Sequence, residues 1–222
     1  MKKIYFIFLL VLFFIVSATN SKAQWTRINF TDTLYQEPLR TRYIVECNNE
    51  LFAMVDGIGL YRSSNEGISW DQLNNINTNI RKVYSGNNTL FYDTWDYKFF
   101  RSTDNGNTWN SIDNSFLIFP VLPPPNDLTQ YMVINSLTAN SYYIFIGTGA
   151  GIFRSGDNGI TWTSCSTGLP NDYYNVHFIE VTSLLILDQY LFAGTIYQGV
   201  YLSTNNGEKW ESTSEGLPRW RI

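Results

Sequence analysis

The chain has 222 residues with 19 acidic and 15 basic side chains, which give a formal net charge of −4. This length is sufficient for one domain with a sizeable core. The acidic balance makes nucleic acid a poor candidate partner, and the presence of a single histidine excludes a histidine-based metal cluster.

The N-terminus has the pattern of a secretory signal peptide. Lys2 and Lys3 precede an apolar run over residues 4–18, and Ser21-Lys22-Ala23 provides a small-x-small cleavage site. We therefore predict a signal peptide over 1–23, cleaved before Gln24; an uncleaved anchor is the alternative. The apolar run is short for a span of about 20 residues. Cleavage removes three lysines and no acids, so the formal charge goes from −4 to −7. A bacterial protein that is secreted, periplasmic or at the cell surface, with no membrane span after cleavage, is expected.

An eight-residue pattern occurs four times, with Trp-to-Trp steps of 39, 53 and 48 residues. That spacing is typical of a repeat array. The copies share Ser at the first place, Asp or Asn at the third, Gly at the fifth and Trp at the eighth. These residues are Ser63, Asn65, Gly67 and Trp70; Ser102, Asp104, Gly106 and Trp109; Ser155, Asp157, Gly159 and Trp162; and Ser203, Asn205, Gly207 and Trp210.

Each copy reads as the turn of a β-hairpin, because Ser, Asp and Asn bond their own backbone in tight turns and Gly supplies a positive φ. Strand-like runs precede each copy and a shorter one follows each Trp. The pattern predicts four-stranded antiparallel blades over about residues 40–75, 78–114, 130–168 and 178–216. The segment 24–30, beginning Trp25-Thr26-Arg27-Ile28, looks like an extra N-terminal strand.

The pattern resembles the Asp-box, or BNR, repeat of β-propeller blades, as in sortilin-like, photosystem-assembly-factor-like and sialidase-type proteins. Copies two and three fit it fully, whereas copy one has Asn65 and Ser69 and copy four has Asn205 and Lys209. The resemblance implies an all-β propeller in which the box is structural. Asp104 and Asp157 are then turn formers; a calcium loop is the alternative, but too few carboxylates cluster there. No metal and no cofactor are expected.

The number of blades leaves two arrangements open. Four blades close on themselves with help from the 24–30 strand, or the array is open or truncated. Open blade edges would invite strand addition by another chain. Cys47 and Cys165 lie in different repeats, and two buried thiols are expected rather than a disulfide.

Strand alternation places the loops between the second and third strands of each blade on the same face as the connections between blades. The long connections 113–131 and 171–180 therefore share a face with the Asp93 loop. Loops on a rigid scaffold are the usual place for binding. The candidate ligand-binding residues are Asp93, Trp95, Tyr173, Tyr174 and His177. The alternative is that these side chains only pack on the ends of the blades.

The interpretation we favour is an exported, non-enzymatic scaffold or binding module for a protein, peptide or glycan partner. The alternative is a fragment of a secreted Asp-box glycoside hydrolase, sialidase-like or glucanase-like. Three arginines, Arg62, Arg101 and Arg154, each precede a box, which puts them near the opposite face from the loops. No pair of carboxylates is singled out for glycoside hydrolysis, so no catalytic residue is assigned.

Overall fold

The computed structural model describes residues 40–76, 79–120, 129–131, 133–171 and 178–217. Four four-stranded antiparallel sheets make up nearly all of it, together with a two-stranded hairpin and one 3-10 turn. The chain is therefore an all-β propeller of four-stranded blades, as predicted. The predicted leader and the 24–30 strand lie outside the described residues.

Each blade is built from strands that pair in chain order. Blade 1 contains β1 (Thr41–Cys47), β2 (Glu50–Val55), β3 (Gly59–Ser63) and β4 (Asp71–Gln72). Blade 2 contains β5 (Ile80–Gly86), β6 (Thr89–Thr94), β7 (Phe99–Ser102) and β8 (Asn110–Ile112). Blade 3 contains β11 (Ile134–Ala139), β12 (Ile144–Thr148), β13 (Gly151–Ser155) and β14 (Thr163–Ser164). Blade 4 contains β15 (Val181–Leu187), β16 (Tyr190–Thr195), β17 (Gly199–Ser203) and β18 (Glu211–Ser212). Between blades 2 and 3 lie η1 (Ser115–Leu117), β9 (Ile118–Pro120) and β10 (Thr129–Tyr131).

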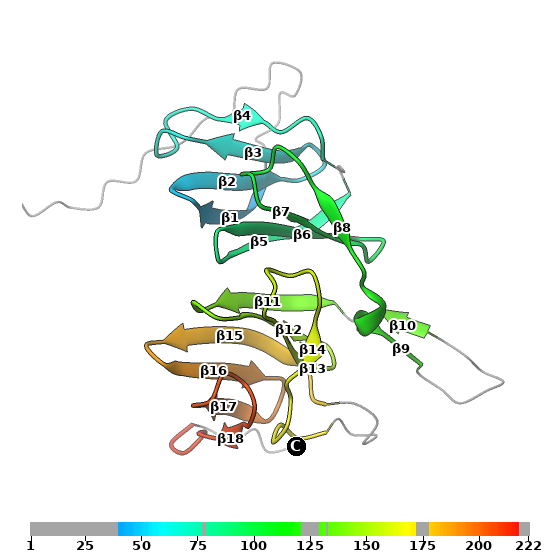
Figure 1. Ribbon diagram of the computed structural model, residues 1–222, viewed down its shortest axis with the longest axis vertical. Coiled ribbons are helices and arrows are strands. Elements are labelled where there is room, and N and C mark those ends of the chain that lie inside the picture. The colour runs from blue at the N-terminus through cyan, green and yellow to red at the C-terminus, as the bar shows by residue number, and fades with distance from the viewer. Residues whose placement is uncertain (1–39, 77–78, 121–128, 132, 172–177, 218–222) are drawn as a thin grey trace, which may run out of the picture.

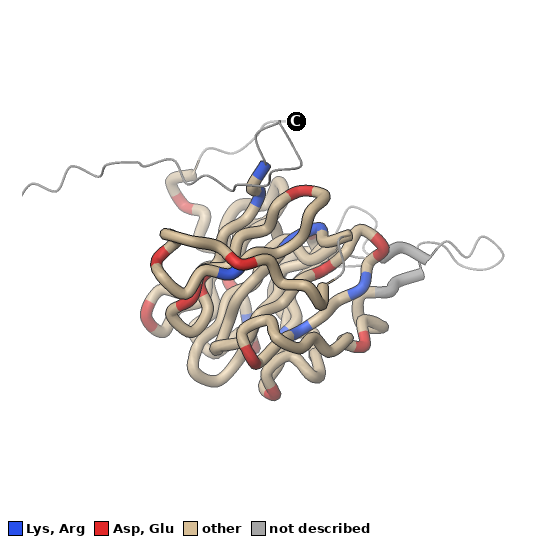
Figure 2. The backbone as a smooth tube through the Cα atoms, turned by 90° about the horizontal axis from the view of Figure 1, so that it is seen from above, with Lys and Arg blue, Asp and Glu red and all other residues tan. Residues whose placement is uncertain are grey.

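The blades form an open array (Figure 1). The first strand of each blade lies beside the first strand of the next, so that β1 contacts β5, β5 contacts β11 and β11 contacts β15. Among the described strands, β1 has no comparable contact with β15. Charged positions are spread over the array, with no large group of one sign, in the view from above (Figure 2).

A β-bulge occurs at the same place in all four blades, near the start of the first strand. A bulge bends the strand and re-aims one side chain. The re-aimed residues are Arg42, Arg81, Asn135 and Thr182. Arg81 and Asn135 use this orientation to reach the first residue of the following blade, Ile134 and Val181 respectively.

The four copies of the eight-residue pattern, here called the repeat turns, join the third and fourth strands of each blade. In all four, the Ser Oγ accepts a hydrogen bond from the Gly N at 2.8–2.9 Å. The residue before that Gly has a φ of 54–59° in every copy. The Oδ1 at the third place accepts from the backbone N at the seventh. The repeat turns are thus held by their own side chains.

In copies one to three a second bond joins the side chains at the third and seventh places; in copy one, Asn65 Nδ2 donates to Ser69 Oγ at 2.8 Å. Asp157 Oδ2 also accepts a bond from Thr161 Oγ1 at 2.6 Å, and Asp104 does the same with Thr108. Partial burial acts to raise the pKa of Asp157, but the bonds from Thr161 and Ser155 outweigh it and lower this pKa to about 2. In the fourth copy Lys209 turns away to pair with Glu211 at 2.8 Å.

Replacing Asp157 by alanine should therefore destabilise the fold by about 1–2 kcal/mol through lost turn hydrogen bonds. Thermal unfolding measures this. Asn205→Ala is the matched control and should cost less, because the Asn205 side chain accepts two hydrogen bonds where that of Asp157 accepts four. A loss of some binding activity with an unchanged melting temperature would contradict the structural role.

Three apolar cores lie between successive blades. Each contains a fully buried phenylalanine of a second strand, namely Phe52, Phe91 or Phe145. The glycine of the following repeat turn packs on its ring. A Cβ added at Gly159 would lie 2.5 Å from Phe91, so this glycine is required both for space and for its φ of 82°. Cys47 and Cys165 are buried free thiols, as predicted.

An arginine at the end of the third strand ties each blade to the next. Arg62, Arg101 and Arg154 donate through Nη1 to the carbonyl oxygens of Asn105, Asn158 and Asn206, at 3.5, 3.3 and 2.7 Å. Those asparagines occupy the fourth place of the following repeat turn. We call this contact the inter-blade clasp. Blade 4 has Leu202 where the other blades have arginine.

Candidate binding site on the loop face

The two ends of the blades form different faces. On one, here the turn face, the hairpin between the first two strands of blade 1 meets the repeat turn of blade 2, with Asn48 Nδ2 donating to Asn105 Oδ1 at 2.6 Å. Asn140 and Asn206 make the same contact between blades 3 and 4 at 2.8 Å. The opposite end, the loop face, carries the turns between second and third strands and the β9–β10 hairpin (Figure 1).

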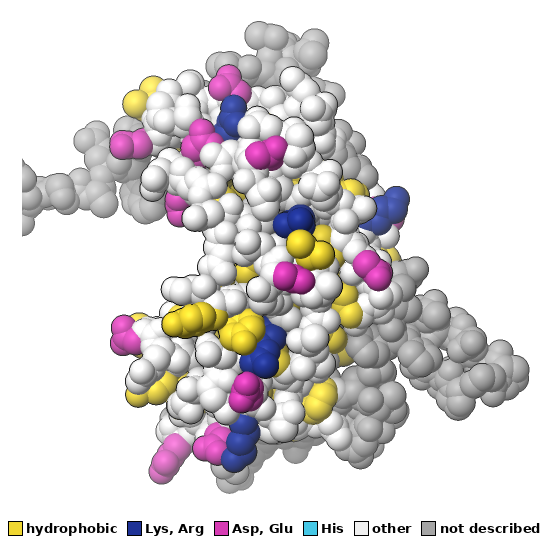
Figure 3. Space-filling view, viewed as in Figure 1, with side chains coloured by type: hydrophobic (Ala, Val, Ile, Leu, Met, Phe, Trp, Pro, Cys, Tyr) yellow, Lys and Arg dark blue, Asp and Glu magenta, His cyan; other side chains and the backbone are white. Residues whose placement is uncertain are grey.

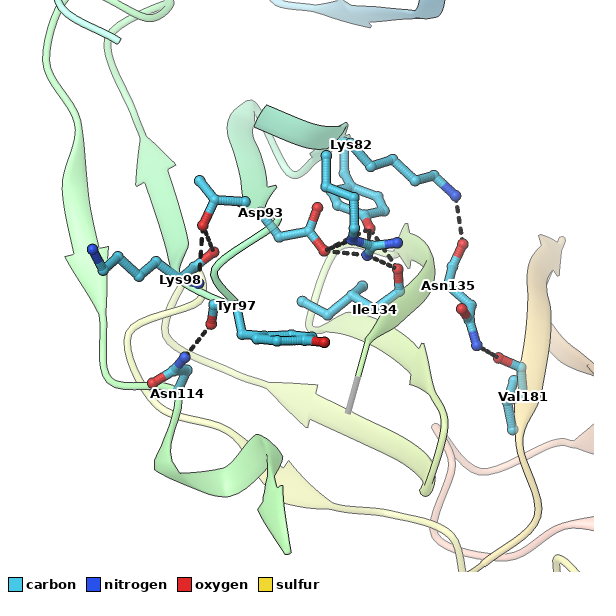
Figure 4. Close-up of polar contacts among 11 residues, drawn as sticks. Lys82, Asp93, Tyr97, Lys98, Asn114, Ile134, Asn135 and Val181 are labelled. Atoms are coloured by element: carbon cyan, nitrogen blue, oxygen red, sulfur yellow. Dashed lines mark hydrogen bonds and ion pairs between the residues drawn. The ribbon is translucent and has the colours of Figure 1, made fainter. Parts of the chain in front are cut away.

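The turn between β6 and β7 presents aromatic side chains on the loop face. Trp95 is 57% exposed and Tyr97 is 43% exposed. The turn is held by Thr94, whose Oγ1 accepts from Lys98 N at 3.0 Å, and by Asn114, whose Nδ2 donates to Tyr97 O (Figure 4). Hydrogen bonds from Thr94 and Lys98 lower the pKa of Asp96 to about 2. Both aromatic side chains are therefore partly exposed on a firmly held loop, and the Tyr97 ring also lies beside Asp93 and Ile134 (Figure 4).

Asp93, at the end of β6, lies beneath this turn and is only 6% exposed. Arg81 donates to its Oδ2 through Nε at 2.9 Å and also through Nη2. Arg81 Nη2 and Tyr84 OH both donate to Ile134 O, each at 2.6 Å. Asp93 thus belongs to a polar cluster that joins blade 2 to blade 3.

The polar cluster continues towards blade 4 (Figure 4). Lys82 Nζ donates to Asn135 O at 2.5 Å, and Asn135 Nδ2 donates to Val181 O at 3.1 Å. Blades 2, 3 and 4 are therefore linked near the loop face by buried or half-buried hydrogen bonds.

The other carboxylate oxygen of Asp93, Oδ1, is buried without a hydrogen-bond partner. Asp93 also lines a cavity of about 10 Å³, together with residues that include Thr94, Phe99 and Leu117. This is the volume of about one water molecule. Burial raises the pKa of Asp93 to about 6, although Arg81 acts to lower it. Asp93 is a carboxyl poised near neutral pH but enclosed by its neighbours.

The described residues include two of the five predicted site residues, and these two lie in different environments. Trp95 is exposed on the loop face, whereas Asp93 is buried and engaged by Arg81. Tyr173, Tyr174 and His177 lie outside the described residues.

The sequence reasoning missed Tyr97 and Tyr197, which lie in corresponding turns of blades 2 and 4. Tyr197 is 82% exposed, and both residues have a positive φ, of 61° and 66°. Such a φ is unusual for a bulky residue and is a feature of functional turns. In both blades the tyrosine stands two places before the third strand, but its exposure follows from the positive φ, which the sequence pattern alone does not predict.

A second hollow lies on the turn face and has a volume of about 270 Å³. Its lining is polar and comes from the hairpins of blades 1 and 2, with Glu46, Asn48, Ser85 and Asn87 among the residues. The molecular surface is indented on this side, between the upper and lower blades of Figure 3. Carboxylate, hydroxyl and amide groups of this kind suit a small hydroxylated ligand.

The four repeated blades, each with the same bulge and the same tryptophan, agree with the protein family whose model the sequence matches. Residues 12–219 match the DUF6242 beta propeller domain. The chain belongs to this family. No curated protein matches this DUF6242 propeller.

Solved structures similar to the DUF6242 propeller have the same kind of fold. The extracellular domain of BT4673 from B. thetaiotaomicron is 17% identical, with a TM-score of 0.56 over 86% of this chain and 24% of that one. The Niastella koreensis GH74 enzyme is 17% identical, with a TM-score of 0.51 over 76% of this chain and 29% of that one. YCF48 bound to D1 peptide is 14% identical, with a TM-score of 0.50 over 79% and 52%. The chain spans about a quarter to a half of these relatives.

None of the described helices of the DUF6242 propeller is long and apolar enough to cross a bilayer. Its described residues also contain no group of three or more His, Cys, Asp or Glu side chains placed to hold a metal ion.

Proposed function

We propose that the protein is an exported, non-enzymatic propeller scaffold that binds a protein, peptide or glycan partner on its loop face. The observation that carries this proposal is the turn of blade 2, where Trp95 and Tyr97 are exposed on a loop fixed by Thr94 and Asn114. Aromatic rings held in place lose little conformational entropy on binding and supply contact area for peptides and sugars.

The repeat turns are, in this proposal, Asp-boxes of the BNR type. Support comes from the Ser–Gly bond shared by all four copies and from the double acceptance by Asp104 and Asp157. Their side chains are occupied in holding the hairpins, so the ligand is expected elsewhere, on the loop face.

Truncating Trp95, Tyr173 and Tyr174 together to alanine should weaken partner binding at least about tenfold and leave the melting temperature nearly unchanged, because loop tips contribute little to the core. A glycan and peptide array, or a partner recovered by pull-down, provides the ligand. The control is Tyr142→Ala, because Tyr142 is 74% exposed and lies on the turn face. Full affinity in the triple variant would move the site to the turn-face hollow or to an open blade edge, where a partner adds a strand.

Export is part of the same proposal and rests on Lys2, Lys3 and the apolar run that follows them. Mass spectrometry of the native protein should find an N-terminus at Gln24. A cytosolic protein that still begins at Met1 would contradict export without touching the loop-face site.

A secreted glycoside hydrolase is the second candidate, and the raised pKa of Asp93, about 6, is the observation that favours it. General acids of glycosidases have raised pKa values. Against it, Arg81 and Tyr84 enclose this carboxyl. Release of reducing ends from β-glucans or of sialic acid from sialosides, abolished by Asp93→Asn in a folded variant, would favour the enzyme. If neither substrate is cleaved, the proposal of a binding module stands.

A further inference from the structure

Three of the four repeat turns have an asparagine directly before their glycine, at Asn105-Gly106, Asn158-Gly159 and Asn206-Gly207. An asparagine side chain reacts with its own backbone most readily when glycine follows it, because glycine has no side chain to obstruct the attack. The three asparagines share one backbone conformation, with φ values of 54–55°. In each turn the glycine N donates to the serine Oγ at 2.8–2.9 Å. The backbone is thus alike at the three sites, and the side-chain contacts distinguish them.

The preceding blade holds the side-chain amides of two of these asparagines. Asn48 Nδ2 donates to Asn105 Oδ1 at 2.6 Å, and Asn105 Nδ2 donates to Glu50 Oε2 at 2.6 Å. Asn140 Nδ2 donates to Asn206 Oδ1 at 2.8 Å. Both asparagines are also half-buried. Each amide must therefore leave a hydrogen-bonding partner before it can react.

The third asparagine, Asn158, is exposed, and its side-chain amide makes no hydrogen bond with any residue that the structure describes. The register of the preceding hairpin explains the difference. In blade 2, Thr89 stands at the place that Glu50 has in blade 1. Thr89 Oγ1 donates back to Asn87 O at 3.2 Å, within its own hairpin. The amide of Asn158 is consequently free to turn towards its own backbone.

We propose that Asn158 is a site of spontaneous deamidation, at which Gly159 N attacks Asn158 Cγ. The new N–C bond closes a succinimide ring, and the side-chain nitrogen leaves as ammonia with the proton of the glycine nitrogen. Water then opens the ring at either carbonyl and gives aspartate or isoaspartate. Both products carry an additional negative charge, and isoaspartate also lengthens the backbone of the turn by a methylene group.

This modification alters the inter-blade clasp between blades 2 and 3. Arg101 Nη1 donates to Asn158 O at 3.3 Å, and this carbonyl adjoins the reacting side chain. Gly159 lies so close to Phe91 that an added Cβ would be 2.5 Å from the ring. The longer backbone of isoaspartate displaces both the carbonyl and the glycine. Deamidated protein should therefore be less stable than fresh protein.

The test compares the three sites within one molecule. The full chain is aged at about 37 °C and pH 8, where asparagine is chemically labile, and peptide mapping by mass spectrometry follows each site. The same measurement in urea gives the rate for each site without folded contacts, and the ratio of the two rates is the protection by the fold. Protection of Asn158 should be at least about fivefold weaker than that of Asn105 and Asn206. Equal protection at the three sites, or weaker protection at Asn105 or Asn206, overturns the proposal.

Asn48→Gly combined with Glu50→Thr removes both partners of Asn105 and is the matched variant. Glycine accepts the φ of 52° at position 48, and threonine is the residue that blade 2 has at the place of Glu50. Asn105 should deamidate at least about threefold faster in this variant than in the wild type, while the rate at Asn158 stays the same. An unchanged rate at Asn105 in the folded variant contradicts the proposal, because hydrogen bonds would not then control these sites.

The effect on the clasp is measured by urea denaturation of aged protein. Asn158→Gln is the control, because the longer side chain forms the corresponding ring far less readily. Aged wild type should unfold at a lower urea concentration than fresh wild type, and aged Asn158→Gln should retain its midpoint. An equal loss of stability in both proteins would mean that deamidation at Asn158 does not open the contact between blades 2 and 3.

Discussion

Replacing Trp162 by alanine should lower the free energy of unfolding by about 3–5 kcal/mol, measured by urea denaturation. Trp162 is 9% exposed. Its ring stacks on Phe116 at 5.8 Å between centroids and meets Phe91 and Phe99 at 6.4 and 6.0 Å. The substitution therefore opens a cavity in the core between blades 2 and 3. A cost below about 1 kcal/mol, typical of exposed sites, would contradict this packing.

Replacing a buried tryptophan by phenylalanine separates the contribution of ring packing from that of the indole N–H group. Trp162 Nε1 is buried without a partner, so Trp162→Phe removes no hydrogen bond. Trp210 Nε1 donates to Cys165 O at 2.7 Å, so Trp210→Phe leaves a buried carbonyl without its donor. We expect Trp210→Phe to cost about 1–3 kcal/mol more than Trp162→Phe. Equal costs would mean that packing alone accounts for both tryptophans.

Replacing Arg81 by alanine should cost about 3–5 kcal/mol at pH 7.5, because it leaves Asp93 buried without its cation. Arg42→Ala is the matched control, since Arg42 is the bulge residue of blade 1 and pairs with Asp56 at 2.6 Å in a partly exposed position. That variant should cost less than about 1 kcal/mol. Similar costs for the two variants would contradict the role of the Arg81–Asp93 pair.

The cost of Arg81→Ala should also depend on pH. The pKa of Asp93 is raised to about 6 in the folded protein, so the folded state holds this proton more tightly than the unfolded state. The stability that Asp93 contributes is then fully present below its ordinary pKa of about 4 and is lost as pH rises through 6, by up to ~3 kcal/mol. Without Arg81 the folded pKa rises further, so the variant should lose less at pH 4.5 than at pH 7.5. Denaturation at both values measures this difference.

The fold was accessible from the sequence because its determinants are local. Ser155, Asp157 and Gly159 bond within one turn, so their spacing alone predicts a hairpin. Trp162 is buried in the core between blades 2 and 3, which the spacing of the turn does not specify. The contacts between blades could not be predicted in this way. That Arg101 reaches the carbonyl of Asn158 depends on how two sheets are stacked, which no local pattern encodes.

The candidate site was only partly accessible for the same reason. Trp95 was selected because an aromatic residue in a predicted loop is conspicuous, and the structure shows that it is exposed. Asp93 looked like its polar companion, but the bulge in β5 turns Arg81 onto it and buries the pair. Tyr97 was not selected, because its exposure follows from a backbone with positive φ rather than from its place in the sequence.

The inter-blade clasp also affects the order in which the protein matures during synthesis. Each clasp arginine is made before its acceptor, and the separations are 43, 57 and 52 residues. At a synthesis rate of about 5–20 residues per second, each acceptor is synthesised roughly 2–11 s after its arginine. A newly made blade therefore has a hydrated clasp arginine and an uncovered phenylalanine until the next blade is complete. Vectorial synthesis would then lock the array one blade at a time, each new blade securing the one before it.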